Sequence, residues 1–519
     1  MAITEQQRIA WLSDNEALRC ILIETSYGTT QGGNLVTDVG DDLVTDIPDF
    51  LVFPSDGSIA SNVYLSNVGY KTEIGDTPSS QPYLPVIVGG IRFTESLDLE
   101  SKASLSFGDL EIDNTNGDYD YWLDYIWTNR DITVYFGDVT WDRDDFFIVF
   151  DGVIDGIDSK SRDVLSIKVL DKLQRLNTPM SEAVIGGNTA NKDNLLPVLH
   201  GEAFNAAPVL INDSTLEYQI HNGVMESFIE IRDNGVPVSF TGDLVNGKFT
   251  LDENPYGTIT CSAQGDASSA TYKNTVADIV QNIAINYGDE SKRFDVADID
   301  TANFTQFNID NPQPVGIYSS SRMNCLNAIN QLSDSVGAQA IMSREGKLRL
   351  LKIDFPVTGV PVSISPVNMV ERSLKISSRI PVKAAIKVGY CKNWTVQSDL
   401  TTGIPDEHKL LFSEQWVYKI KSDAGVQADY SLDTEPTQKD TLLLDDTDAD
   451  NEASRLLGVY STQRTIFEFD GFPDLTDLQV GDAVTLTHDR FGLSSGKDGM
   501  VVKMQIDWLK MQVKLGIMV

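Results

Sequence analysis

Short apolar runs, separated by Gly, Asp, Asn and Pro, recur along most of the chain. This pattern is typical of β-strands joined by turns. A polar turn, Ser159–Asp163, separates the runs Asp151–Asp158 and Val164–Leu170, which predicts a hairpin. Further strands are predicted at Cys20–Glu24, Thr133–Phe136, Phe146–Phe150, Phe249–Leu251 and Ala385–Val388.

The segment Leu475–Val519 has the clearest strand pattern in the chain. It predicts three strands, Ala483–His488, Met500–Asp507 and Gln512–Met518, joined by Gly- and Asp-rich turns. No polar tail follows the third strand. Because unpaired chain ends fray, we expect this last strand to be hydrogen-bonded into a sheet.

Three segments instead show the helical spacing of apolar residues, at i, i+3, i+4 and i+7. They are Thr275–Tyr287, Arg322–Val336 and Asp450–Thr462. The first two are followed by Gly288 and Gly337, which are typical helix stops, and a Ser triplet before the second is a predicted N-cap. The acidic run before the third suits a helix N-terminus. The fold class is therefore mainly β with a few short helices (α+β).

The length of 519 residues predicts about three to five domains. A near-duplication within residues 28–46 (Leu35–Val39 and Leu43–Ile47) predicts a surface loop or hairpin, since nothing else recurs at that period. Polar or Gly-rich stretches near Pro179–Asn191, Gly265–Thr271 and Phe355–Pro366 suggest boundaries. The predicted division is 1–180, an N-terminal β module; 181–270, a β module; 271–375, an α+β domain; and 376–519, a C-terminal β-barrel with one helix.

The net charge of −36 argues against a DNA-binding surface and against docking on anionic lipid. It favours solubility, with an acidic surface for a basic partner as the alternative. No apolar run is long enough for a membrane span, and the N-terminus lacks the features of a secretory signal. We therefore predict no nucleic-acid binding and no membrane insertion.

The four cysteines, Cys20, Cys261, Cys325 and Cys391, are far apart and form no Cys-x-x-Cys pair. Buried free thiols are the expected state, and neither a disulfide framework nor a zinc site is predicted. Asp113–Gly117 resembles a calcium loop, but Ile112 and Leu123 would occupy its first and twelfth ligand positions. A tight Asn-Gly turn explains this segment better.

No catalytic motif is present, and the four histidines (His200, His221, His408 and His488) are isolated. Only His200 and His221 could be close neighbours, and a structural or surface role is expected for the histidines, in preference to catalysis. Carboxylates are plentiful, so a glycosidase pair stays open. We assign no catalytic, cofactor-binding or metal residue. The following aromatic residues form a dense group that predicts a packed corner or a subunit contact, with sugar binding as the alternative: Tyr119, Tyr121, Trp122, Tyr125, Trp127 and Trp141.

A series of segments along most of the chain resembles a known protein family when the segments are taken in order. Each segment by itself consists of Gly and Asp residues at turns between strands. In the first part they are Tyr64–Tyr70, Asp76–Pro78, Leu105–Asn114, Gly117–Trp122, Phe146–Gly156 and Val169–Leu173. Pro197–Asn205, Pro208, Tyr218–Gly223 and Gly247–Gly265 follow. Then come Tyr272–Asp354 with Arg344–Lys347 at a hairpin turn, Glu452–Leu457, Leu478–Asp482, Thr487–Arg490, Gly492–Leu493 and Gly496. In this order they resemble the tail-tip or baseplate hub proteins of tailed bacteriophages and related gene-transfer particles, with a distal-tail-like N-terminal module.

The resemblance implies a structural virion protein, made in the host cytoplasm and located at the distal end of the tail. In this family two β-barrel-like or β-sandwich hub domains per subunit let a homotrimer present a nearly six-fold ring to the tail tube. The hub also helps to close the tube before genome ejection. The implied partners are the tail tube or distal tail ring, the tape-measure protein, and tail fibre or receptor-binding proteins involved in host attachment.

Some siphophage hubs hold an iron–sulfur cluster through clustered cysteines near the C-terminus. Here the last cysteine is Cys391 and no cluster exists, so no such cofactor is predicted. The chain is expected not to be an enzyme. The alternatives are a distal tail ring protein, a carbohydrate-binding adaptor or a tail-associated glycan hydrolase, the last of which would need converging carboxylates in a cleft.

Overall fold

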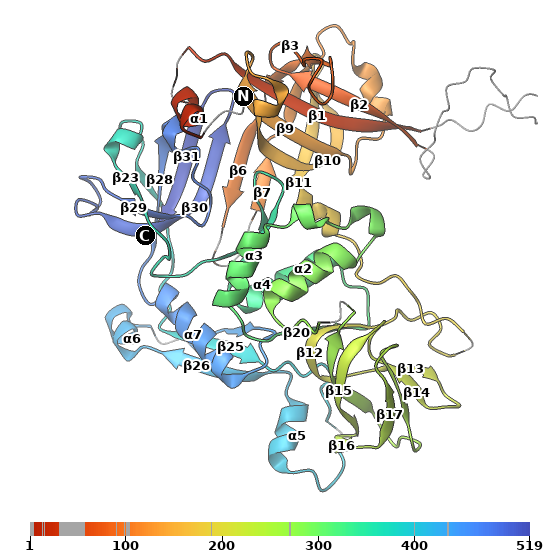
Figure 1. Ribbon diagram of the computed structural model, residues 1–519. Helices are drawn as coiled ribbons and strands as arrows, with labels where there is room; N and C mark the ends of the chain where they lie inside the picture. The colour runs from red at the N-terminus through yellow and green to blue at the C-terminus, as the bar shows by residue number, and fades with distance from the viewer. Residues whose placement is uncertain are drawn as a thin grey trace, which may run out of the picture.

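The computed structural model of the chain describes residues 5–12, 14, 16–30, 58–89, 91–97, 99, 104–187, 189–268, 271–398, 400–432 and 435–519. Over these residues the protein is mainly β with seven α-helices, which confirms the predicted fold class. The near-duplication at residues 28–46 lies mostly outside the described residues. In Figure 1 the strands from the two ends of the chain lie side by side above a group of helices, α2, α3 and α4.

The N-terminal strands form an antiparallel series in the order β2–β1–β9–β10–β11. The predicted hairpin is confirmed as β10–β11, but its turn is shorter than expected, because β10 continues to Ser161. The strands of this series are β1 (Arg19–Thr30), β2 (Ser58–Ser66), β9 (Asp131–Asp138), β10 (Phe147–Ser161) and β11 (Val164–Asp171).

Shorter strands extend this series at both ends. At one end β4 pairs with β2 in parallel and β3 pairs with β4. At the other end β7 and β8 pair with β11, β5 pairs with β8, and β6 pairs with β7. These strands are β3 (Tyr70–Lys71), β4 (Pro82–Pro85), β5 (Ile87–Gly89), β6 (Arg92–Ser96), β7 (Ser104–Phe107) and β8 (Leu110–Asp113).

The C-terminal strands pair in the order β23–β29–β30–β31–β28–β24. Strand β30 also pairs with β6, so strands from the two ends of the chain share one sheet. The last strand, β31, lies between β28 and β30, which confirms that the chain's final segment is sealed into a sheet. The bounds are β23 (Val362–Ile364), β24 (Lys375–Arg379), β28 (Thr465–Gly471), β29 (Ala483–Leu486), β30 (Lys497–Asp507) and β31 (Gln512–Met518).

The expectation of a closed C-terminal β-barrel within 376–519 is wrong. Over the part of the chain that is described, the pairings of this sheet stay open and end at β23 and β24. Strand β30 shares one edge between β29 and β6, so the sheet continues into the N-terminal strands instead of closing on itself. The four-part division of the chain remains a prediction.

Two further sheets pack face to face as a β-sandwich, and a second hydrophobic core lies between them. One has the order β16–β15–β19–β12–β20 and the other β13–β14–β18–β17. Phe249 and Tyr218 from the second sheet meet Ile231, Cys261 and Ala203 from the first. The strands are β12 (Val198–Ala206), β13 (Val209–Asn212), β14 (Glu217–Gln219), β15 (Met225–Asp233), β16 (Val236–Pro237), β17 (Phe240–Asp243), β18 (Lys248–Leu251), β19 (Ile259–Asp266) and β20 (Gly316–Ser319).

The three predicted helices are confirmed, with shifted ends. Helix α2 (Val276–Asn286) is capped by Thr275, whose hydroxyl accepts a hydrogen bond from the Asp278 amide at 3.4 Å. Helix α4 (Cys325–Ser335) begins later than predicted, and its N-cap is Asn324, so the Ser triplet does not cap it. The reason is that Ser319 still belongs to β20 and its hydroxyl donates to the Ser321 carbonyl.

The third predicted helix, α7 (Asp446–Tyr460), begins four residues early, at a cap formed by Asp445. It covers one face of the sheet β26–β25–β27, around Val388 and Ala453. The strands are β25 (Ala385–Tyr390), β26 (Val417–Ser422) and β27 (Gln438–Asp440); the hairpin β21 (Ala338–Met342) and β22 (Leu348–Lys352) follows α4. The remaining α-helices are α1 (Glu5–Leu12), α3 (Thr301–Asp310), α5 (Asp406–Ser413) and α6 (Ala424–Tyr430). The 3-10 helices are η1 (Asp120–Asp124), η2 (Arg143–Asp145), η3 (Lys172–Leu176), η4 (Glu290–Lys292), η5 (Val296–Asp298), η6 (Pro366–Asn368) and η7 (Pro473–Leu475).

Candidate functional site: polar junctions between sheets and helices

The described residues contain no group of three or more His, Cys, Asp or Glu side chains that could hold a metal ion. At the calcium-like segment, the Gly117 amide donates to the Asn114 carbonyl at 2.9 Å, and Gly117 has a φ of +75°. The Asn114 side chain donates to Asp120 at 2.7 Å and accepts from the Tyr119 amide at 2.9 Å. The predicted tight turn is confirmed, and its own side chains satisfy its polar groups.

The cysteines are free thiols, as predicted. Cys20, Cys261 and Cys325 are buried, and Cys391 is partly buried. Burial raises the pKa of Cys20 to about 12 and of Cys325 to about 11. Because the thiolate is the reactive form, the raised pKa values disfavour reactivity, and the buried thiols pack as small apolar groups.

The predicted aromatic group divides into two. Tyr119 and Trp127 both pack on Trp122, with ring centroids 4.6 and 5.3 Å away, and Tyr125 lies 5.7 Å from Tyr121. Trp141 belongs elsewhere, 4.5 Å from the Trp11 ring. The indoles of Trp122 and Trp127 are buried, which confirms the packed corner. Tyr121 is exposed at its rim.

His200 and His221 are neighbours, with ring centroids 6.5 Å apart. Their side chains are 2% and 1% exposed. His221 Nδ1 accepts a hydrogen bond from the Leu199 amide at 3.0 Å, and His200 Nδ1 lies 3.7 Å from Asp266 Oδ2. Burial lowers the pKa of His200 to about 3 and of His221 to about 4, so both are neutral at pH 7. The other two histidines lie apart, His408 exposed on α5 and His488 beside Asp489.

Asp266 joins these histidines to helix α2. Its Oδ2 accepts hydrogen bonds from Asn282 Nδ2 at 2.6 Å and from the Tyr287 hydroxyl at 2.8 Å. Burial alone would raise the pKa of Asp266, but hydrogen bonds from Ser268 and the other partners lower it to about 2. We call His200, His221, Asp266, Asn282 and Tyr287 the histidine cluster. Through the Asp266 contacts it fastens the sandwich to α2 and to Tyr287 directly after it.

A second buried polar group forms at the turn of the β21–β22 hairpin. Arg344 Nε donates to Glu95 Oε1 of β6 at 2.6 Å. The Arg344 Nη1 and Nη2 groups donate to the carbonyls of Thr476 and Leu478, at 2.6 and 2.7 Å. We call these four residues the hairpin junction. One guanidinium thus links the helical middle of the chain to β6 near one end and to the loop after η7 (Pro473–Leu475) near the other.

The same hairpin turn also packs closely on β10. Gly346 has a φ of +70°, and a Cβ there would lie 2.2 Å from Asp151 Oδ2. Asp151 in turn accepts from Lys172 Nζ at 3.1 Å, and Lys172 donates to Asp298 at 2.8 Å. Only glycine fits this turn, because any side chain would collide with a carboxylate that is already paired.

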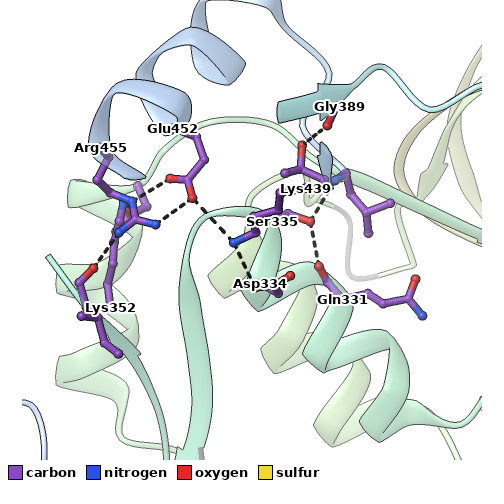
Figure 2. A network of polar contacts seen from close by, with 12 residues as sticks. Gln331, Asp334, Ser335, Lys352, Gly389, Lys439, Glu452 and Arg455 are labelled. Atoms are coloured by element: carbon purple, nitrogen blue, oxygen red, sulfur yellow. Dashed lines mark hydrogen bonds and ion pairs between the residues drawn. The ribbon is translucent and has the colours of Figure 1, made fainter. Parts of the chain in front are cut away.

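A third group, the helix junction, lies between α7 and α4 (Figure 2). Arg455 forms a bidentate pair with Glu452, one turn earlier on α7, through two contacts of 2.7 Å. Arg455 Nη1 also donates to the Ile353 carbonyl at 2.6 Å. Lys439 Nζ bridges to Asp334 at 3.0 Å and to Glu452 at 3.8 Å. Figure 2 shows the Lys439 ammonium between the Glu452 carboxylate, which is paired with Arg455, and Asp334.

Backbone contacts complete the helix junction. The Ser335 hydroxyl donates to the Gln331 carbonyl at 2.7 Å and accepts from the Leu442 amide at 2.8 Å. Thr441 Oγ1 donates to the Gly389 carbonyl at 2.7 Å. Helix α4 is thereby tied to the segment that leads into α7.

Gly337, directly after α4, leaves the room that the helix junction needs. Its φ is +71°, and a Cβ there would lie 1.9 Å from Arg455 Nη2 and 3.0 Å from Glu452 Oε1. Burial lowers the pKa of Lys352 nearby, and the charge of Arg455 adds to this. The sequence analysis recognised Gly337 only as a helix stop.

Sequence reasoning missed the hairpin and helix junctions as sites, although it placed Arg344 at a hairpin turn. One signal was available. Phe93, Glu95 and Leu97 alternate on the buried face of the β6 segment, so a carboxylate stands at an inward position and requires a buried cationic partner. Nothing in the sequence identifies Arg344 as that partner.

No protein family and no curated protein matches this sequence. Among solved structures, the chain is similar to the 43 kDa tail protein of prophage MuSo2 from Shewanella oneidensis, with 11% identity, a TM-score of 0.38, and coverage of 85% of this chain and 96% of that one. It is also similar to a prophage tail protein from Listeria monocytogenes, with 10% identity, a TM-score of 0.38, and 85% and 92% coverage. A third is a chain in the virion of a native gene transfer agent particle, with 10% identity, a TM-score of 0.40, and 67% and 91% coverage. TM-scores this low do not establish a common fold.

Proposed function

We propose that the chain is a structural protein of a phage tail tip or baseplate and forms its central hub. The ordered segments that resemble hub proteins support this proposal. The observation that carries it is the sheet shared by β6 and β30, which the hairpin junction fixes to the helical middle. This pairing joins strands from both ends of the chain into one hydrogen-bonded sheet.

The described side chains are arranged for packing more than for chemistry. The two buried histidines are neutral and engaged with α2, and the paired carboxylates of the junctions face guanidinium or ammonium groups. A cavity of about 730 Å³ lies beside β27 and α7; of the two carboxylates in its lining, Asp334 and Glu435, the first is paired with Lys439 at 3.0 Å. We therefore propose a role other than catalysis.

The finer parts of the proposal concern assembly. We propose a homotrimer at the distal end of the tail, joined to the tail tube or distal tail ring, to the tape-measure protein and to fibre or receptor-binding proteins. Within it, the division at 180, 270 and 375 gives an N-terminal and a C-terminal region that together build the ring. In this position the ring helps to close the tube before genome ejection.

Electron microscopy of purified particles tests this proposal. A chain carrying a gold-labelled tag is expected at the distal tail end, in three copies, and deletion of its coding sequence is expected to give tails without tips. A six-fold ring of this chain would instead support a distal tail ring protein. Absence of the chain from particles would refute the tail function.

A further inference from the structure

The C-terminal sheet ends in a strand whose outer edge is unpaired. Within the described residues β24 pairs only with β28, through Lys375↔Glu468 to Arg379↔Thr465. All five residues of β24 are exposed. An open edge of this kind presents backbone N–H and C=O groups to another chain, and native proteins cover or protect it.

Exposed apolar side chains follow the same edge. Val367, Val370 and Phe472 are brought together because the Val370 amide donates to the Asp470 carbonyl at 2.8 Å and the Phe472 amide to the Asn368 carbonyl at 3.2 Å. A hollow of about 440 Å³ opens here; Val370, Phe472, Met511 and Val513 supply its apolar lining, and Arg92, Asp470, Asp507 and Lys514 supply its charged lining. We call β24 with Val367, Val370 and Phe472 the edge surface. Contiguous apolar surface of this kind marks an interaction site.

Beside β24, three lysine side chains surround a single carboxylate, although the chain as a whole carries a net charge of −36. One carboxylate, Glu468, is surrounded by the ammonium groups of Lys375, Lys503 and Lys514, at 3.6, 3.3 and 3.9 Å. Arg379 adds another exposed cation on β24. This local excess of positive charge favours an acidic partner.

The opposite end of the same strand order carries an acidic loop with an exposed isoleucine. The pairings run from β3 and β4 through β2, β1, β9, β10, β11, β7, β6, β30, β31 and β28 to β24. The loop Thr72–Gln81 follows β3, and we call it the Ile74 loop. Ile74 is 87% exposed at its tip, beside Glu73.

The Ile74 loop is held in one conformation by its own contacts. Asp76 Oδ2 accepts from the Glu73 amide at 2.6 Å, and the Ser79 hydroxyl donates to the Ile74 carbonyl at 2.8 Å. Beneath the loop, the Tyr70 ring packs at 5.2 Å on Phe146. A preorganised loop loses little conformational entropy on binding, so its exposed isoleucine is well suited to act as an anchor.

We propose that the Ile74 loop of one copy docks on the edge surface of a second copy. Ile74 would enter the hollow beside Val370 and Phe472, and Glu73 would lie near Lys375. The apolar and charged features complement each other, and a single copy leaves both exposed. Because the two surfaces differ, the contact is head-to-tail, which generates a closed ring or a filament. The inference rests on the proposed assembly role and identifies its contact surface.

Sedimentation of the purified full-length chain over a concentration range tests this contact. We expect concentration-dependent association, which Ile74→Asp and Lys375→Glu each weaken by at least about tenfold. The matched control is Ile309→Asp, because Ile309 is also exposed and apolar but lies on α3. Unchanged thermal unfolding of each variant shows that folding is intact. A wild-type chain that stays monomeric, or association that Ile74→Asp leaves unchanged, would overturn the proposal.

Two further measurements identify the paired residues. The charge exchange Glu73→Lys with Lys375→Glu is expected to restore association relative to either single variant. A mixture of Ile74→Cys and Ile376→Cys chains of different tag length is expected to give a mixed disulfide-linked dimer, which the same mixture with Ile309→Cys in place of Ile74→Cys does not. Particles that carry Ile74→Asp chains with normal tail tips would leave the tail function standing and would overturn this contact.

Discussion

The hairpin junction and the histidine cluster both bury titratable groups where different parts of the chain meet, but they do so in opposite ways. Arg344 and Glu95 form a buried ion pair at 2.6 Å. His200 and His221 stay uncharged, because burial holds their pKa values at about 3 and about 4. An ion pair is therefore sensitive to loss of one partner, whereas a neutral histidine is sensitive to acid.

The largest effect is expected from deleting Gln512–Val519. This removes β31, which hydrogen-bonds β30 and β28 on its two sides. The C-terminal sheet should fail to fold and the chain should be lost from particles, while the sandwich with its histidine cluster keeps its structure. Hydrogen exchange of the truncated chain and particle composition measure this. A truncated chain that still assembles would contradict it.

Arg344→Met should destabilise the protein by about 3–5 kcal/mol, because it leaves the Glu95 carboxylate buried without a cation. Denaturant unfolding measures the change. The control is Arg322→Met, whose partner Glu182 lies 3.7 Å away in an exposed pair, where a loss below about 1 kcal/mol is expected. Equal losses for the two variants would contradict a special role for the hairpin junction.

Mild acid should lower the stability of the protein through the histidine cluster. The folded-state pKa values of His200 and His221 lie below the ordinary 6.5, so the unfolded chain binds more protons between those values. Stability is fully present above pH 6.5 and is lost as the pH falls toward 4, by up to about 2 kcal/mol per histidine near pH 5. Unfolding as a function of pH measures this.

The matched variants for the acid effect are His221→Gln and His408→Gln. His221→Gln should remove about half of the pH dependence, because His200 remains, and His408→Gln, at an exposed position of α5, should leave it unchanged. A pH profile that is flat between 6.5 and 4 in the wild-type chain would show that the histidine cluster does not control acid stability.

The smallest effect is expected at the helix junction, where Arg455 and Glu452 lie on the same helix and stay paired when neighbours move. Gly337→Ala should cost about 1–2 kcal/mol from its positive φ, plus the clash with Arg455 Nη2. Gly186→Ala has a similar φ of +69° with nothing within 4 Å, so it measures the backbone part alone. Equal losses in thermal unfolding would show that Arg455 moves aside freely.

Local pattern predicted many individual elements. The strand Gln512–Met518 is β31 as observed, and the apolar stripe of Thr275–Tyr287 marks α2. Helix α3 was missed because its stripe is short, with Phe304 and Phe307 buried among Asn and Thr residues. Periodicity reports which face of an element is buried, so it succeeds where that face is continuous.

Long-range pairing could not be predicted in the same way. Closure of the barrel expected in 376–519 depended on which strand pairs beside β29 along the second half of β30, and that strand is β6. The partner of Arg344 was open for the same reason. The partner of β30 and the partner of Arg344 both depend on which segments far apart in the sequence come into contact. A single sequence indicates such a contact only through a strand edge without a partner or a charged residue at an inward-facing position.

The pairing of β6 with β30 can form only late in synthesis, because Ser96 pairs with Lys503, which is translated much later. The sandwich and helices α2–α4 lie between these strands in the chain, so they leave the ribosome and can fold while β6 still has an open edge. Contacts between such distant segments close slowly. The nascent N-terminal strands therefore pass through a period of exposure to unwanted pairing, and that period ends only when the final strands emerge.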